Sequence, residues 1–203
     1  MTRRAMIALL VPVRWAPPGV DPARWREALA EDVVDGIAGL REVQPAIAAG
    51  PDDRALADAV AWPGMPVYDL PEITANAALA AAAADGHAQA AVVAADAPDV
   101  PGLVLGKLLR PLTSRPLALA PAGAGAPGLL GVAAQLPSPA WLPPVDLDTA
   151  QVAPIRAAAP QPGDVAVATG WRRLRGPADL ASLDPGLEGW DATRALLSPH
   201  DWS

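Results

Sequence analysis

The chain of 203 residues contains no cysteine, no phenylalanine and only two histidines, His87 and His200. Without cysteine there are no disulfides and no thiolate metal ligands. Two histidines also make a histidine-rich zinc site improbable on composition. His87 follows Gly86, which is placed to end a helix, and we expect it to lie on the surface. The sequence therefore directs attention to carboxylates and arginines as the groups that could carry chemistry.

Basic charge and long apolar runs are also scarce. The net charge is −7 and the pI is near 4.7, which argues against a nucleic-acid partner or an anionic membrane but allows a small arginine cluster. No uninterrupted apolar run approaches the roughly 20 residues that span a bilayer. Residues 2–13 superficially resemble a signal peptide, but Pro12 and Arg14 argue against it. We expect a cytoplasmic protein that neither spans nor binds a membrane.

Strand and helix patterns alternate along the chain, without an internal repeat or a long linker. This alternation is typical of an α/β fold with a mostly parallel sheet covered by helices on both faces, and we expect one domain over residues 1–203. Residues 129–136 fit either a strand or a short helix. The other expected strands are 6–13, 44–49, 65–68, 90–95, 117–120 and 164–168, and the expected helices are 22–40, 52–60, 73–85, 102–112, 150–158, 177–184 and 190–197.

Residues 90–101 (AAVVAADAPDVP) are the most informative stretch, a short apolar strand that ends in Asp96, Asp99 and two prolines. In open α/β sheets, ligands bind just beyond the carboxyl ends of the strands. A carboxylate there can hold a divalent cation or a ribose hydroxyl. The alternative is turn chemistry, because Asp and Pro are common at strand exits for local reasons.

The same stretch resembles the G-x-D-x-P-D-L-P segment of GT-A-fold nucleotidyl- and glycosyltransferase-like proteins. The resemblance extends over most of the chain, through segments in a shared order: 11–14 (VPVR), 18–24 (PGVDPAR), 76–79 (NAAL), 120–131 (APAGAGAPGLLG) and 177–180 (PADL). The chain is most similar to bacterial glycosyltransferase-like proteins linked to arsenosugar biosynthesis, and to the related phospholactate guanylyltransferases. The resemblance implies a Rossmann-like GT-A sandwich.

The resemblance also implies a ligand, a nucleotide or nucleotide-sugar, and a Mg²⁺ or Mn²⁺ cofactor. It implies Asp96 and Arg24 as catalytic residues, and Asp96 and Asp148 as metal ligands. The implied nucleotide- and phosphate-binding residues are Pro12, Arg14, Gly19, Asn76, Asp96, Asp99, Arg173 and Arg175. For Asn76 an alternative is local, since Thr74 or Asn76 could start the helix that follows.

The departures from the family pattern lie at charged positions. Pro22 stands where the family's phosphate loop carries a lysine, and residues 123–126 (GAGA) lack the acidic residue of D-G-G-Y. Where the family has D-x-D-T-P-E-D-L, this chain reads RLRGPADL, so that Arg173 and Arg175 replace two acidic residues. Arginines there would repel a divalent cation and attract phosphate or carboxylate instead. One of them could also pair with Asp96 in place of the metal.

Two hypotheses follow. The first is a transferase of nucleotidyl or glycosyl groups from a nucleoside triphosphate or nucleotide-sugar. The second is a non-catalytic protein of the same fold that binds an anionic ligand or a protein partner; a homodimer is compatible with either. An Asp96 that stands alone, without a second carboxylate, and faces Arg173 or Arg175 favours the second hypothesis. An Asp146 or Asp148 that folds back beside Asp96 favours the first, since two carboxylates can hold a metal.

Overall fold

The computed structural model describes residues 3–123 and 125–197. Its centre is a seven-stranded sheet in the order β3-β2-β1-β4-β6-β5-β7. All neighbouring strands are parallel except β6, which runs antiparallel to β4 and β5. The strands are β1 Arg4–Leu9, β2 Gln44–Ala49, β3 Val67–Asp69, β4 Gln89–Ala94, β5 Leu117–Pro121, β6 Leu129–Gln135 and β7 Val165–Val167. The expected α/β class with a mostly parallel sheet is confirmed. Of the two alternatives for residues 129–136, strand or short helix, the structure has a strand over residues 129–135.

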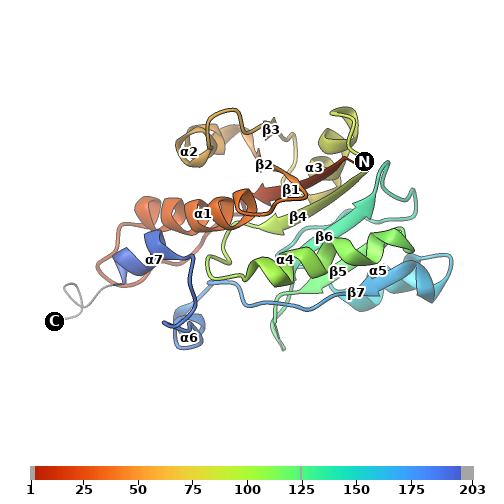
Figure 1. Ribbon diagram of the computed structural model, residues 1–203. Helices are drawn as coiled ribbons and strands as arrows, with labels where there is room; N and C mark the ends of the chain where they lie inside the picture. Colours follow the sequence, from red (N-terminus) through yellow and green to blue (C-terminus); the bar gives the residue numbers. More distant parts are fainter. Residues whose placement is uncertain (1–2, 124, 198–203) are drawn as a thin grey trace.

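Helices cover both faces of this sheet (Figure 1). Helices α1, α2 and α4 pack with Met6 and Ala8 in one core cluster, whereas α3 and α5 pack on the other face with Ile7 and Leu9. Successive residues of a strand point to opposite faces, so β1 contributes to both clusters. The helices are α1 Pro22–Ala38, α2 Arg54–Val60, α3 Ala75–Ala84, α4 Gly102–Leu109, α5 Val152–Ala158, α6 Pro177–Leu180 and α7 Asp191–Leu196.

The ends of the helices follow from local residues. Asp21 caps α1 by accepting a hydrogen bond from the backbone N–H of Arg24 at 2.9 Å, and Pro22 occupies the first turn. Thr74 caps α3 in the same way, because its Oγ1 accepts from the N–H of Ala77. Gly86, with a φ of 80°, lets the chain leave α3 in the left-handed region.

The chain order of the strands reverses direction between β1 and β4. From β1 the chain continues to β2 and β3 on one side, and the remaining strands lie on the other. A crevice forms at such a switch point, outside the carboxyl ends of the two strands, and it is the usual ligand site of open α/β sheets. The structure therefore places the exits of β1 and β4, residues 10–14 and 95–99, at the expected position. No helix of the described residues is long and apolar enough to cross a membrane.

Candidate functional site

A small crevice of about 100 Å³ opens beyond the carboxyl ends of β1 and β4. It is lined by residues from the exit of β1, the exit of β4, and two later loops that fold back over the sheet: Pro12, Val13, Arg14, Asp96, Asp148, Leu174 and Arg175. Five of the residues that the resemblance implies, Pro12, Arg14, Asp96, Asp148 and Arg175, thus meet in one place. The volume suits a phosphate group rather than a whole nucleotide, because pockets for drug-sized ligands are about 300–1,000 Å³.

Beneath the crevice, Asp96 and Arg173 form a buried two-point ion pair. Nε of Arg173 donates to Oδ1 of Asp96 at 2.6 Å, and Nη2 donates to Oδ2 at 2.8 Å. Both residues are 1% exposed. Such a parallel pair of charge-assisted hydrogen bonds is the strongest geometry available to arginine and a carboxylate.

The remaining donors of Arg173 are also taken. Nη2 donates to Oδ1 of Asp148 at 2.5 Å, and Nη1 donates to the backbone oxygens of Leu129 at 3.2 Å and Leu147 at 2.9 Å. A guanidinium has five N–H donors, so every one of them has an oxygen partner. We call these oxygens, from Asp96, Asp148, Leu129 and Leu147, the oxygen cage. The cation inside the oxygen cage is the guanidinium of Arg173 itself.

Close backbone contacts bring the members of the cage together. Gly128 lies against the backbone oxygens of Leu147 and Asp148, where a Cβ would come within 2.5 and 2.7 Å of them. The N–H of Leu174 donates to the backbone oxygen of Asp96 at 2.8 Å, which fixes Arg173 against the strand exit. The cage thus depends on a glycine, since any side chain at residue 128 would push the two segments apart.

Asn76 holds the loop that carries Asp148. Its Nδ2 donates to the backbone oxygen of Pro143 at 3.1 Å, and its Oδ1 accepts from the N–H of Val145 at 2.8 Å. Thr74, not Asn76, supplies the cap of α3. The Asn76 amide therefore makes its hydrogen bonds with the loop before Asp148 and does not line the crevice.

Burial and the charges within the oxygen cage shift the pKa values of Asp96 and Arg173. Burial raises the pKa of the Asp96 carboxyl, against the opposing charge and hydrogen bonds of Arg173. Burial acts to lower the pKa of Arg173, but the neighbouring charges of Asp96 and Asp148 outweigh it and raise that pKa. Arg173 therefore stays charged, and an ionised Asp96 depends on that charge for its stability in the interior.

Asp99 belongs to a second buried pair beside the cage. Its Oδ1 accepts from Nε1 of Trp171 at 3.0 Å, and its Oδ2 accepts from Nη2 of Arg172. The Arg172 guanidinium also lies over the Trp171 ring, 4.7 Å from the centroid. These bonds join residues 171–172 to the exit of β4. Asp99 is 3% exposed and does not line the crevice.

Two arginines at the mouth of the crevice have guanidinium groups that form no ion pair with a carboxylate of the described residues. Arg14 is exposed and makes neither a hydrogen bond nor an ion pair there. The Arg175 side chain donates from Nη2 to the backbone oxygen of Pro127 at 2.8 Å. The nearby Asp179 carboxylate accepts from the backbone N–H of Arg175 at 2.9 Å and not from its guanidinium. Both guanidinium groups therefore remain available to an anion.

Gly19 and Arg24 lie outside the lining of the crevice. Gly19 has a φ of 82° in the turn before α1, and Arg24 is exposed in the first turn of that helix. Arg26 of α1 reaches the exit of β1 instead, where Nη2 donates to the backbone oxygen of Val11 at 3.2 Å. Its guanidinium is held by both carboxylate oxygens of Asp53, at 2.5 and 2.7 Å.

The residues of the cage do not fit a divalent cation in this arrangement. Mg²⁺ binds carboxylates and substrate phosphates in near-octahedral geometry, but both oxygens of Asp96 already accept from Arg173. The charge of Arg173 at the same point would repel the ion. In residues 3–123 and 125–197 we find no group of three acidic or histidine side chains that could hold a metal elsewhere.

Comparison with known proteins gives structural but not sequence relatives. No family model matches the chain, and no curated protein matches it significantly. Among solved structures, a protein of Desulfovibrio desulfuricans assigned as a nucleotide-diphospho-sugar transferase is similar, with a TM-score of 0.64 and 17% identity over 97% of both chains. The 4-diphosphocytidyl-2C-methyl-D-erythritol synthase of Anaerococcus prevotii has a TM-score of 0.60 and 10% identity, over 97% of this chain and 96% of that one.

A third similar structure was solved with ligands. The glucosyl-3-phosphoglycerate synthase of Mycobacterium tuberculosis, in complex with Mg²⁺ and uridine diphosphate, has a TM-score of 0.56 and 16% identity, over 97% of this chain and 78% of that one. At these identities the likeness concerns the fold. The chain therefore has the GT-A-like fold of nucleotide-diphospho-sugar transferases, as the resemblance of residues 93–101 implied.

Proposed function

We propose that the protein binds the phosphate groups of a nucleotide or nucleotide-sugar at the crevice, without a divalent cation. The observation that carries this proposal is the position of Arg173, whose guanidinium fills the oxygen cage between Asp96 and Asp148. In the similar synthase that binds uridine diphosphate, Mg²⁺ accompanies the nucleotide. Here the fixed charge of Arg173 takes the role of the ion in neutralising the two carboxylates.

Arg14 and Arg175 are the groups we assign to the phosphate. Both line the crevice, and neither guanidinium forms an ion pair with a carboxylate of the described chain. Arginine binds phosphate through parallel hydrogen bonds, each strengthened by charge. Since the crevice holds one phosphate group, the sugar and base would lie outside it, over the exit of β1 at Pro12 and Val13.

The crevice is compatible with two functions, a transferase that works without a metal and a non-catalytic binding protein. In a transferase without a metal, arginines must stabilise the charge of the leaving phosphate, and Arg14, Arg175 and Arg24 are the candidates for that role. The second candidate function, a non-catalytic binding protein of the same fold, is favoured by Asp96 itself. A carboxylate whose two oxygens both accept from Arg173 is not free to act as a base or ligand.

The test is calorimetric titration with UDP, CDP, GDP and ADP, each in EDTA and again in MgCl₂. We expect one of them to bind with the same affinity in both buffers. Arg175→Gln and Arg14→Gln should each weaken that binding at least about tenfold, since a charge-assisted hydrogen bond contributes about 1.5–3 kcal/mol. The matched control is Arg156→Gln, an exposed arginine of α5 outside the crevice.

Binding that requires Mg²⁺, or no binding by any of the four nucleotides, would contradict the proposal. Turnover separates the two candidate functions once a ligand is known. The corresponding nucleoside triphosphate and nucleotide-sugars are incubated with the protein in EDTA, and release of pyrophosphate or of nucleoside diphosphate is followed. Release above that of the Arg175→Gln variant supports a transferase, and binding without release supports the non-catalytic protein.

A further inference from the structure

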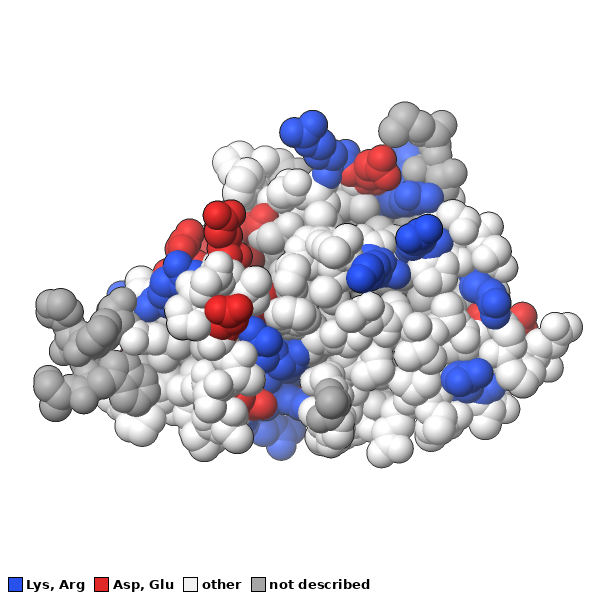
Figure 2. Space-filling view, turned by 60° about the horizontal axis from the view of Figure 1, so that its bottom comes forward, with Lys and Arg blue, Asp and Glu red and all other residues white. Residues whose placement is uncertain are grey.

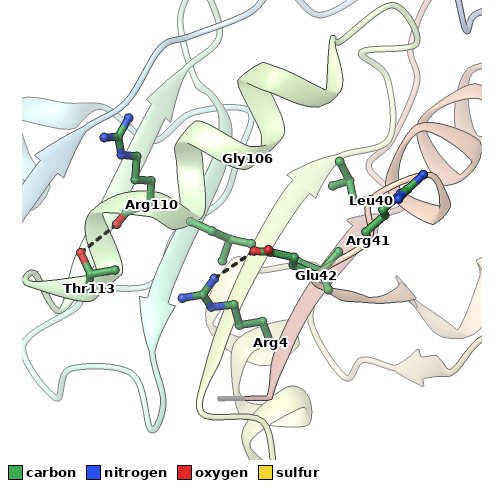
Figure 3. A pocket seen from close by; sticks show the side chains of 9 residues that line it. Arg4, Leu40, Arg41, Glu42, Gly106, Arg110 and Thr113 are labelled. Carbon is green, nitrogen blue, oxygen red and sulfur yellow. Dashed lines mark hydrogen bonds and ion pairs between the residues drawn. The ribbon is translucent and has the colours of Figure 1, made fainter. Parts of the chain in front are cut away.

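A second hollow, wider than the crevice, lies at the amino ends of the strands. It has a volume of about 340 Å³ and lies between the start of β1, the connection from α1 to β2, and the end of α4 (Figure 3). Leu40, Val43 and Leu109 form much of its apolar wall. The volume falls within the range of small-molecule pockets, about 300–1,000 Å³.

Three arginines surround this apolar hollow. Figure 3 shows Arg4 beside Glu42, with Arg110 on one side of this pair and Arg41 on the other. Figure 2 agrees, since the right side of that view, where the amino ends of the strands lie, carries mostly isolated basic side chains on uncharged surface. The acidic side chains in the same view gather on the left. An overall negative protein thus has a positive, apolar hollow at one end.

The Arg4 side chain is held in place from behind. Its Nε donates to Oε1 of Gln89 at 2.8 Å, and the buried Gln89 in turn donates from Nε2 to the backbone oxygen of Leu112 at 3.0 Å. These bonds fix the stem of Arg4 and leave its two terminal nitrogens toward the hollow. Such a pre-positioned charge costs little ordering entropy when a ligand binds.

Among the described residues that line the hollow, Glu42 is the one carboxylate, and it is weakly held. Its side chain is 83% exposed, and its Oε2 lies 3.9 Å from Nη1 of Arg4. Exposed pairs of this kind contribute little to stability, so a better anion can displace Glu42. The C-termini of α1 and α4 add about half a negative charge each. The three guanidinium charges exceed these contributions, and Arg41 and Arg110 have no ion-pair partner among the described residues.

We infer that this hollow binds a small anion with an apolar body, such as a carboxylate or phosphate monoester on a hydrophobic group. The anionic group takes the place of Glu42 beside Arg4, Arg41 and Arg110, and the apolar body packs on Leu40, Val43 and Leu109. This site is separate from the crevice, because the two lie at opposite ends of β1. It goes beyond the proposed function and does not depend on it.

The test uses phenyl phosphate as the probe, titrated into the ¹⁵N-labelled protein. We expect saturable shifts of the backbone amides of Val43, Gly106 and Thr113. Inorganic phosphate, which lacks the apolar body, and phenol, which lacks the charge, should both bind more weakly. Arg41→Gln with Arg110→Gln should weaken phenyl phosphate binding about tenfold or more. Both side chains are exposed and serve no internal bond, so this variant should fold.

Glu42→Gln should change phenyl phosphate binding in the opposite direction to the arginine variants. Because it removes the competing carboxylate, it should tighten phenyl phosphate binding, whereas a purely structural role for Glu42 predicts no change. Arg175→Gln, which changes the crevice, should leave phenyl phosphate binding at the hollow unaltered. This variant therefore distinguishes binding at the hollow from binding at the crevice. Absence of binding at millimolar phenyl phosphate, or equal binding by the Arg41→Gln/Arg110→Gln variant, would overturn the inference.

Discussion

Asp96 and Arg173 face each other in parallel, with Nε–Oδ1 and Nη2–Oδ2 distances of 2.6 and 2.8 Å, beneath the crevice at the carboxyl end of β4. The residues are 77 positions apart, so the pair joins the central strand to a late loop of the chain. A buried ion pair offsets a large desolvation cost only when its geometry is good and its other donors are satisfied. Arg173 meets both conditions, which makes the pair a structural element as well as part of the site.

The first prediction concerns the coupling between these two residues. Arg173→Met should lower the free energy of unfolding by about 3–5 kcal/mol, because it leaves the Asp96 carboxylate buried without its partner. Arg173→Met with Asp96→Asn should recover part of the loss, since the remaining buried groups are then neutral. Urea unfolding of the wild type, the single variants and the double variant measures the coupling directly.

The matched control for this cycle is Arg156→Met, which removes an exposed arginine of α5 that makes no ion pair within the described chain. It should change the free energy of unfolding by no more than about 0.5 kcal/mol. If Arg173→Met were as mild as this control, the pair would not hold the loop to the strand.

The second prediction is that removal of the guanidinium creates a cation site. Arg173→Gly leaves two carboxylates, Asp96 and Asp148, and the backbone oxygens of Leu129 and Leu147 around an open space. Hard divalent cations prefer such oxygen ligands. At Mn²⁺ concentrations about ten times the dissociation constant, linkage gives about 1.4 kcal/mol, which raises the unfolding temperature by about 3–5 °C.

Thermal unfolding with and without MnCl₂ tests this prediction. The wild type should not respond, and Asp148→Asn added to Arg173→Gly should abolish the response of the variant. Mn²⁺ electron paramagnetic resonance gives an independent readout if Arg173→Gly is too unstable for a clear transition. A wild type that responds as strongly as the variant would show that the ion binds elsewhere.

Much of the fold follows from the sequence because its signals are local. Alternating apolar runs, the Asp21-Pro22 helix start and the Gly86 helix end each act within a few residues, and each is present in the structure. The approximate bounds follow for the same reason. The choice between strand and helix for residues 129–135 does not, because the run 129–134 has no polar side chain to set a period. That choice depends on burial between β4 and β5.

The site could be predicted only in part. The two charge reversals at Arg173 and Arg175 are visible in the sequence and indicate a pairing with Asp96, which the structure contains. The oxygens of Leu129 and Leu147 carry no sequence signal, since any residue supplies a backbone carbonyl. The sequence left two arrangements open, a second carboxylate beside Asp96 that could hold a metal, and an arginine that faces Asp96. The structure contains both, because the Arg173 guanidinium lies between the carboxylates of Asp96 and Asp148.

The third prediction concerns the last helix of the described chain. Asp32 of α1 is buried and accepts from the N–H groups of Ala192 at 3.0 Å and Thr193 at 2.8 Å, at the start of α7. Asp32→Asn leaves one of these two N–H groups without its acceptor and should cost about 1–3 kcal/mol, the cost of an unsatisfied buried donor. Hydrogen exchange should show faster exchange at residues 191–196, with Glu31→Gln, an exposed neighbour, as the control. Unchanged protection in Asp32→Asn would exclude this capping role.

The fourth prediction is a pH dependence that arises from His87. We expected a surface residue, but His87 is only 4% exposed and neither ring nitrogen has a hydrogen-bond partner among the described groups. The burial of this ring depends on tertiary packing, which residue order alone does not reveal. Burial lowers the pKa of His87, and the charge of Arg3 adds to this effect. The folded state therefore favours the neutral ring more than the unfolded chain does.

The sign of the effect on stability follows from linkage. The unfolded chain takes up a proton at His87 near its ordinary pKa of about 6.5, whereas the folded chain does so only at lower pH. The free energy of unfolding should thus fall as the pH drops from about 7.5 to about 5.5. His87→Leu and His87→Gln should both flatten this slope in urea unfolding, whatever they do to stability at pH 7.5. Equal slopes in the wild type and both variants would mean that another group controls the pH dependence.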